Sequence, residues 1–118
     1  MTYNKVLESE SGHVFEIDDT LGVERIAVEH RSGTFHEIHP DGSQVTRVVN
    51  DNYTVVCKDD EVYVGGKVNV KVLGDATFDV GGDAKITVAK TTAIESKGNL
   101  SVVAPQISLD GTVIKLNS

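Results

Sequence analysis

The sequence predicts an all-β protein: an elongated homotrimeric β-helix, in which three chains intertwine, with an N-terminal collar of short antiparallel strands. Three observations indicate this fold class: a repeat with a period of eight from Val64 to Val103, alternation of apolar and polar residues within it, and glycine at the third place of most octads. Alternation with period two is the strand period, and repetition at a fixed period is typical of a solenoid or an array. We therefore expect a shaft built from short strands and corners.

The octads place most of their large apolar residues at odd positions, whereas the even positions carry most of the charged and amide groups. The seventh place is apolar in all five octads, and the first and third places hold valine and glycine in most of them. Glycine allows a bend or a close approach of backbone that a side chain would block. We expect the following residues to form the repeat: Val64, Gly66, Val70, Val72, Gly74, Phe78, Val80, Gly82, Ile86, Val88, Ile94, Gly98 and Val102.

An octad is too short to form one full turn of a β-solenoid made by a single chain. Eight extended residues span roughly 26 Å, so a closed three-sided turn would have fewer than about three residues per side. Three chains that wind together solve this problem, because each chain then supplies one face of a turn. We expect the odd places to face the shared axis, and the frame to extend upstream through Val56 and Val48 without its glycines.

Residues 1–46 do not follow the octad and are expected to form the collar. Alternating segments at 13–17, 25–30 and 34–39 predict strands, with Phe15 on the inner face and Ile17 as a further candidate for that face. Turn-forming residues separate these segments, and Pro40, Asp41 and Gly42 give the strongest turn signal. Residues 47–118 form the predicted β-helix, which is clearest over 64–103 and loosens after Val103.

The composition excludes several classes of function. The 118 residues carry a net charge of −7, which argues against binding nucleic acid or anionic lipid through bulk electrostatics. The single cysteine, Cys57, cannot form a disulfide within the chain and is expected to be an ordinary strand residue. No apolar run approaches the length of a membrane span or a signal peptide. The sequence has no phosphate loop, nucleophile elbow or zinc pattern, so we expect no enzymatic activity and no cofactor.

Histidines and carboxylates offer a few candidates for bound ions. His36 and His39 lie three residues apart in a predicted strand, so their side chains face opposite sides and one chain cannot chelate with both. Three copies of one of these histidines could instead converge on the trimer axis and bind a metal. The alternative is an exposed or packed histidine near a turn. The carboxylates at 18–19 and 59–61 are expected to be solvated turn residues.

The octad that begins at Val88 departs most from the pattern. Lys90 replaces the expected glycine, and Thr92 and Ser96 fall on inward places. Polar groups near a threefold axis need partners, so an ion or a water chain on the axis near residues 90–98 is one hypothesis. The interpretation we prefer is a local change of register that turns Lys90 outward.

Several segments resemble a known family when taken in order. The segments are 11–13, 16–20, 24–26, 30–35 and 37–42, followed by the Val-x-Gly octads and the closing Ala-Pro-Gln-Ile-Ser-Leu-Asp-Gly. Together they resemble the C-terminal spike region of contractile-tailed phage baseplate hub proteins, and the related VgrG spikes of type VI secretion. The resemblance implies a structural protein: a trimeric, cell-puncturing needle of a contractile injection system, driven mechanically through the bacterial outer membrane when the sheath contracts.

The resemblance also implies partners and a location. The N-terminal end would join the baseplate hub and the tail tube, at the tip of the tail baseplate of a virion made in the host cytoplasm. The C-terminal end, formed by Leu116, Asn117 and Ser118, would be a flat platform for a small PAAR-like tip protein. Its last 20 residues hold no histidine, unlike the iron-binding apex of some family members. An oligonucleotide/oligosaccharide-binding domain precedes this region in the family, so we expect an excised or unusually short spike.

A second function stays open at this point, because a trimeric repeat would also suit a phage fibre or adhesin segment that binds cell-surface polysaccharide. Such adhesins usually expose aromatic platforms or grooves. This chain has only three Phe and three Tyr, mostly on strand-like segments, so the spike is the preferred interpretation.

Overall fold

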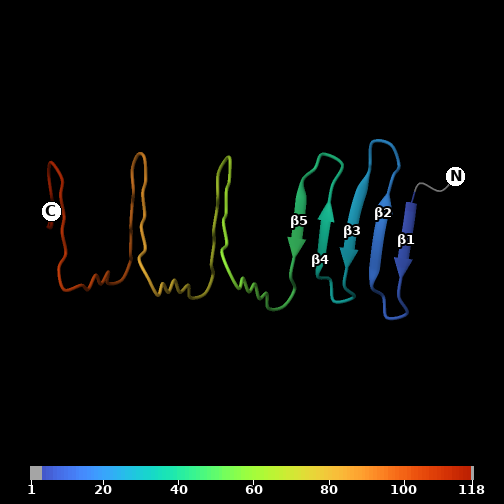
Figure 1. Cartoon of the computed structure of the whole chain (residues 1–118), viewed down its shortest axis with the longest axis horizontal. Coiled ribbons are helices and arrows are strands. Elements are labelled where there is room, and N and C mark those ends of the chain that lie inside the picture. The colour runs from blue at the N-terminus through green and yellow to red at the C-terminus, as the bar shows by residue number, and fades with distance from the viewer. Residues whose placement is uncertain (1–3, 118) are drawn as a thin grey trace. The chain divides into compact units, whose positions relative to one another are not determined.

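The computed structural model describes residues 4–117, and these contain β-strands and no helix. Five strands form one antiparallel sheet in which each strand pairs with the next along the chain (Figure 1). The strands are β1 (Asn4–Glu8), β2 (Val14–Asp18), β3 (Arg25–Glu29), β4 (Phe35–Ile38) and β5 (Gln44–Arg47). Within the described residues, no helix could span a membrane. The prediction of an all-β chain with N-terminal antiparallel strands is therefore confirmed, although β1 was not expected as a separate strand.

Three of the four turns in the sheet share one hydrogen-bond pattern, at residues 9–13, 30–34 and 39–43. The first residue of each turn donates its N–H to the carbonyl oxygen of the fifth at 2.8–2.9 Å, and its own carbonyl accepts from the fourth at 2.9–3.1 Å. The fourth residue is always glycine, with φ between +86° and +100°. These are the features of a three-residue hairpin loop, a type I turn followed by a left-handed glycine. The predicted turn at Pro40, Asp41 and Gly42 is one of them.

The register of the strands places the acidic residues on one face of the sheet and most of the large hydrophobic residues on the other. Residues that pair across strands share one face, and successive residues of a strand face opposite sides. One side, the charged face, holds all the acidic residues of the strands. These are Glu8, Glu16, Asp18, Glu29 and Glu37. The other side, the apolar face, holds no acidic residue, and its large hydrophobic side chains are Leu7, Phe15, Ile17, Ile26, Val28 and Ile38.

The sheet has almost no core of its own. Ala27, at 1% exposure, is the single buried hydrophobic residue of residues 4–117. On the apolar face, Phe15, Ile26 and Val28 stay 44–47% exposed and Leu7 is 73% exposed. The predicted inner residues Phe15 and Ile17 thus lie on the apolar face, which nothing in the single chain covers.

The segment after β5 consists of extended stretches separated by regularly spaced bends. Within the described part of the chain, no strand follows β5, because no backbone lies beside these stretches to pair with them. Bends fall at residues 49–50, 57–58, 65–66, 73–74, 81–82, 89–90, 97–98 and 105, each eight residues after the last. The predicted octad is thus a period of the backbone, and the bends at Val49 and Cys57 confirm that the frame extends upstream without glycine.

The spacing of the bends also shows whether the repeat stays regular at Lys90 and after Val103, where the sequence departs from the pattern. The bends at 89–90 and 97–98 stay in phase with the earlier ones, so the predicted change of register at Lys90 is wrong. Lys90 takes the corner position of its octad, with its side chain exposed. After Pro105 the next bends fall at Thr112 and Leu116, out of phase, which confirms that the repeat loosens there.

The chain divides into two compact units, residues 1–68 and residues 69–118. The first contains the sheet and the first bends, and the second contains the remaining octads. The boundary expected between residues 46 and 47 falls one residue before the end of β5, and it stays a prediction about the assembled protein.

Candidate interaction surface

The corners of the octads do not need glycine for the conformation of this chain. Among residues 4–117, positive φ occurs only at Gly12, Gly22, Gly33 and Gly42, all of them in the sheet. At the glycines of the repeat from Gly65 to Gly98, an added Cβ would meet no atom within 4 Å. Asn50, Lys58 and Lys90 occupy the same third place without strain. A requirement for glycine there must therefore come from a neighbouring molecule.

Apolar side chains of the repeat are exposed according to their place in the octad. The first-place valines from Val48 to Val88 are 37–52% exposed. The seventh-place residues are 64–87% exposed, so the chain leaves them almost bare. These seventh-place residues are Val62, Val70, Phe78, Ile86, Ile94 and Val102. A continuous series of bare apolar side chains, one in each octad, marks a surface built to be covered.

The accessible surface of the chain is far larger than that of a compact protein. It measures 12,092 Å². A folded monomer of this mass would expose about 6,200 Å². The excess approaches 6,000 Å², which exceeds the roughly 2,000–5,000 Å² buried by many obligate protein interfaces. The excess is therefore as large as the area that obligate assemblies bury.

The charged face of the sheet satisfies its central charges within the chain. Arg25 on β3 pairs with Glu16 on β2 and donates from Nη1 to Oε1 of Glu37 on β4 at 3.1 Å. Glu16 and Glu37 are the direct cross-strand partners of Ala27, two residues along from Arg25. The side chains therefore close over Ala27, and the hydrogen bond with Glu16 raises the pKa of Arg25 above its ordinary value. Sequence reasoning missed this network, since it depends on the strand register.

The histidines serve local contacts. His36 bonds through Nδ1 to the hydroxyl of Thr46 at 2.8 Å, whereas Nε2 of His39 lies 3.6 Å from Oε1 of Glu37. Because His36 and Glu37 are adjacent in β4, these contacts lie on opposite faces and confirm that one chain cannot chelate with both histidines. Convergence of either histidine on a trimer axis stays a prediction.

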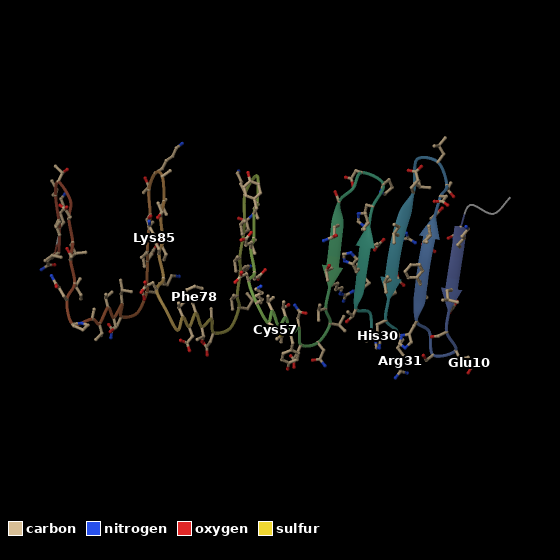
Figure 2. All side chains as sticks on the ribbon, viewed as in Figure 1. Glu10, His30, Arg31, Cys57, Phe78 and Lys85 are labelled. Carbon is tan, nitrogen blue, oxygen red and sulfur yellow. The ribbon has the colours of Figure 1, made fainter. Side chains whose placement is uncertain are left out.

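A second histidine pair lies at the end of the sheet where Figure 2 shows Glu10, His30 and Arg31. The rings of His13 and His30 are 4.5 Å apart. The backbone N–H of Arg31 donates to Nδ1 of His13 at 3.2 Å, and that of Ser32 donates to Nδ1 of His30 at 3.1 Å. The bond from Arg31 and the paired rings join the loop of residues 9–13 to that of residues 30–34, whereas the bond from Ser32 lies within the second loop.

The candidate carboxylates lie next to turns and bends. The Oδ1 atom of Asp18 accepts the N–H of Thr20 at 2.9 Å, and hydrogen bonding to Thr20 lowers the pKa of Asp18. Asp59, Asp60 and Glu61 are exposed beyond the bend at Cys57, which is itself exposed. No group of three or more potential metal ligands is found within residues 4–117. Thr92 and Ser96 are exposed in the single chain, so an ion on a shared axis is untested.

The predicted tip end is described only in part. Leu116 is 87% exposed and Asn117 is exposed, whereas Ser118 lies outside the described residues. Binding of a tip protein at this end stays a prediction.

One contact joins the sheet to the first corner of the repeat. The N–H of Val49 donates to Oγ1 of Thr34 at 3.2 Å. A methyl group of Val49 also lies 3.5 Å from the position that a Cβ on Gly33 would occupy. The loop between β3 and β4 therefore fixes where the first bend begins. The sequence alone did not indicate a contact between Thr34 and Val49. The one signal was the octad pattern, which extends upstream as far as Val48.

Taken together, an antiparallel sheet with one bare face and a run of unpaired, in-phase octads define an all-β repeat protein whose apolar surfaces the single chain leaves uncovered. No family model matches the chain. Over 76 residues, 64% of its length, it is 58% identical to Protein Gp5 of Vibrio phage KVP40. Over the same length it is 34% identical to the pre-baseplate central spike protein Gp5 of Enterobacteria phage T4. The chain spans 18% and 13% of the lengths of these relatives. The predicted resemblance to phage baseplate spike proteins is confirmed.

Proposed function

We propose that this chain forms the shaft of the central spike of a phage tail baseplate. Three copies intertwine into a β-helix, and the trimer acts mechanically, as a needle that pierces the bacterial outer membrane. The protein works as a structural component of the virion tail. The proposal assigns it no catalytic step and no cofactor.

The observation that carries the proposal is the in-phase series of unpaired octads. Eight consecutive bends at a spacing of eight residues leave stretches with free backbone donors and acceptors on both sides. Unpaired extended backbone invites another strand, and a closed set of three chains would satisfy every edge. The bare seventh-place side chains supply the matching apolar interior. Similarity to a pre-baseplate central spike protein supports the role as a baseplate spike.

Intertwining suits a needle that carries load. Hydrogen bonds between chains run along the whole shaft, so no free strand edge is left at which a chain could peel away. Chains that wind around one another separate only by unravelling together, which makes their stability kinetic. The net charge of −7 per chain keeps the outside of such a trimer soluble and discourages adhesion to anionic surfaces.

The two ends of the shaft take different partners in this proposal. The sheet lies toward the baseplate hub and tail tube, and the C-terminal end, with Leu116, Asn117 and Ser118, carries a small tip protein of the PAAR type. The out-of-phase bends after Pro105 set this segment apart from the octads, as a segment with a partner of its own would be.

The mass of the assembly tests the proposal. We expect light scattering and unboiled SDS gels of the full chain to give three times the 12.7 kDa chain mass. Boiling should release the monomer. A folded monomer would overturn both the architecture and the function. Trimers should disrupt outer-membrane vesicles only when driven onto them by force. Binding of the trimer to surface polysaccharide, without such disruption, would favour an adhesin instead.

A further inference from the structure

We propose that the apolar face of the β1–β5 sheet packs against the same face of other copies of this chain, and that this contact sets the register in which the octads align. The inference rests on the proposed trimer. It gives the sheet a function of its own: the sheet is the element that determines which octad of one chain meets which octad of the next.

The octads alone specify their alignment poorly. The eight in-phase bends bound seven octads of equal length. If one chain slips by eight residues, Val72 replaces Val64, Gly74 replaces Gly66 and Phe78 replaces Val70. Most places keep their type of residue, the exceptions being Asn50, Lys58, Lys90, Thr92 and Ser96, and one octad at each end loses its contacts. Repetitive strands are prone to such slippage. A unique alignment therefore needs a segment that does not repeat.

The sheet is that segment, and its apolar face fits a copy of itself. Two or three identical surfaces bring identical charges together, so only a surface without excess charge packs against its copy without repulsion. The charged face carries all the carboxylates of the strands and is excluded on this ground. The apolar face has no carboxylate, and its exposed Leu7, Phe15, Ile26 and Val28 need cover. Its remaining polar positions are Lys5, His36, Gln44 and Thr46.

The register of the sheet is passed to the repeat by the contact between Thr34 and Val49. The hydroxyl of Thr34 holds the N–H of Val49, which begins the first bend. Every later bend follows at eight residues. Once the sheets of three chains are level, their first bends are level as well, and the remaining octads align in order.

The single cysteine provides a direct readout of register. Cys57 is exposed at the second bend, so a nitroxide label can be attached there in the full chain. Pulsed electron paramagnetic resonance then measures the distances between labels in the trimer. Level chains should give one narrow distance distribution for the natural sequence. A slipped chain would add longer distances, because its label is displaced by one octad.

Two matched variants separate the faces. Val28→Lys places a charge on the apolar face, and Val45→Lys places the same charge on the charged face beside Glu37. The two valines are similarly exposed, at 47% and 40%, so a lysine fits at either in the single chain. We expect Val28→Lys to broaden the label distances or to abolish the trimer, and Val45→Lys to leave both unchanged. Narrow distances in trimers of Val28→Lys would overturn the inference.

A second experiment does not depend on how Val28→Lys folds. A chain that lacks residues 64–71 loses one octad but keeps the sheet and Cys57. In mixed trimers with the full chain, we expect all Cys57 labels to stay level, because the sheets align first. Labels displaced by one octad would show that the octads set the register, and would overturn the inference. A natural chain that is monomeric would instead overturn the proposed function itself.

Discussion

Arg25 donates a hydrogen bond from Nη1 to Oε1 of Glu37 at 3.1 Å, from β3 to the neighbouring β4. The second arm of the same guanidinium pairs with Glu16 on β2. One side chain thereby joins three strands and covers Ala27, the single buried hydrophobic residue of the described chain. Because Glu16 and Glu37 keep only 15% and 17% of their side-chain surface exposed, both depend on this arginine for their charge balance.

Replacing Arg25 with glutamine should therefore destabilise the sheet. The change leaves two poorly solvated carboxylates without a cation, and we expect a loss of about 1 kcal/mol per chain after allowance for the partial exposure of Arg25. Arg47→Gln is the matched control, since Arg47 makes no ion pair within residues 4–117 and is exposed. Hydrogen exchange of the β2, β3 and β4 amides would measure the effect. Equal exchange in both variants would contradict it.

The difference between what the sequence predicted and what it missed follows from the range of the interactions. Alternation over a few residues predicted β2, β3 and β4, and the turn residues Pro40, Asp41 and Gly42 predicted the third hairpin loop. The Arg25 network was missed because Glu16 and Glu37 are nine and twelve residues away from Arg25, and only the strand register brings them together. No local pattern encodes that register.

In the octad repeat, too, local features were predicted correctly, whereas features that depend on distant partners were not. The period of eight is local, so it predicted the bends correctly, including those at Val49 and Cys57 that have no glycine. Bends do fall at Gly66, Gly74 and Gly82 as expected. Neither a positive φ nor a close neighbour in the single chain requires glycine at these places, so close approach at the corners stays a prediction. The partners that decide this role belong to other molecules, which one sequence does not place.

The seventh-place residues should stabilise the trimer strongly although they are bare in the single chain. Ile86→Ala removes a side chain that is 87% exposed, so it should cost nothing in a monomer. If three copies bury it, the loss is about 2–5 kcal/mol per chain. Leu73→Ala is the control, because Leu73 is 91% exposed at a corner and outside the seventh place. The temperature at which unboiled SDS trimers dissociate measures the effect. Similar temperatures for the two variants would refute the assignment of the interior.

Substitution at the corners tests the requirement for glycine. Gly82→Val should lower the yield of trimer. A Cβ at Gly82 meets no atom of its own chain, so only a neighbouring chain can leave no room for a side chain there. Lys90→Val, at the same place of the next octad, should leave the yield unchanged, since a longer side chain already occupies that corner. Size-exclusion chromatography after refolding compares them. Normal assembly of Gly82→Val would mean that the glycines are not packed in the trimer.

The loop of residues 39–43 should respond to acid through Asp41. Its Oδ1 accepts the N–H of Ser43 and its Oδ2 accepts the hydroxyl, both at 2.9 Å. These bonds, chiefly the one from the backbone, lower the pKa of Asp41 below its ordinary value. A carboxyl with a lowered pKa in the folded state contributes stability above its unfolded pKa of about 3.9, and that stability is lost as the pH falls through the folded value.

Asp41→Ala should accordingly weaken the loop at neutral pH and have no further effect in strong acid, where the natural side chain is protonated as well. Hydrogen exchange at Gly42 and Ser43, measured from pH 7 down to about pH 2 and corrected for the intrinsic rate, would follow both chains. Asp19→Ala is the control, because the described structure gives Asp19 no hydrogen bond. A difference between Asp41→Ala and the natural chain that persists at pH 2 would mean that the side chain acts through backbone conformation and not through its charge.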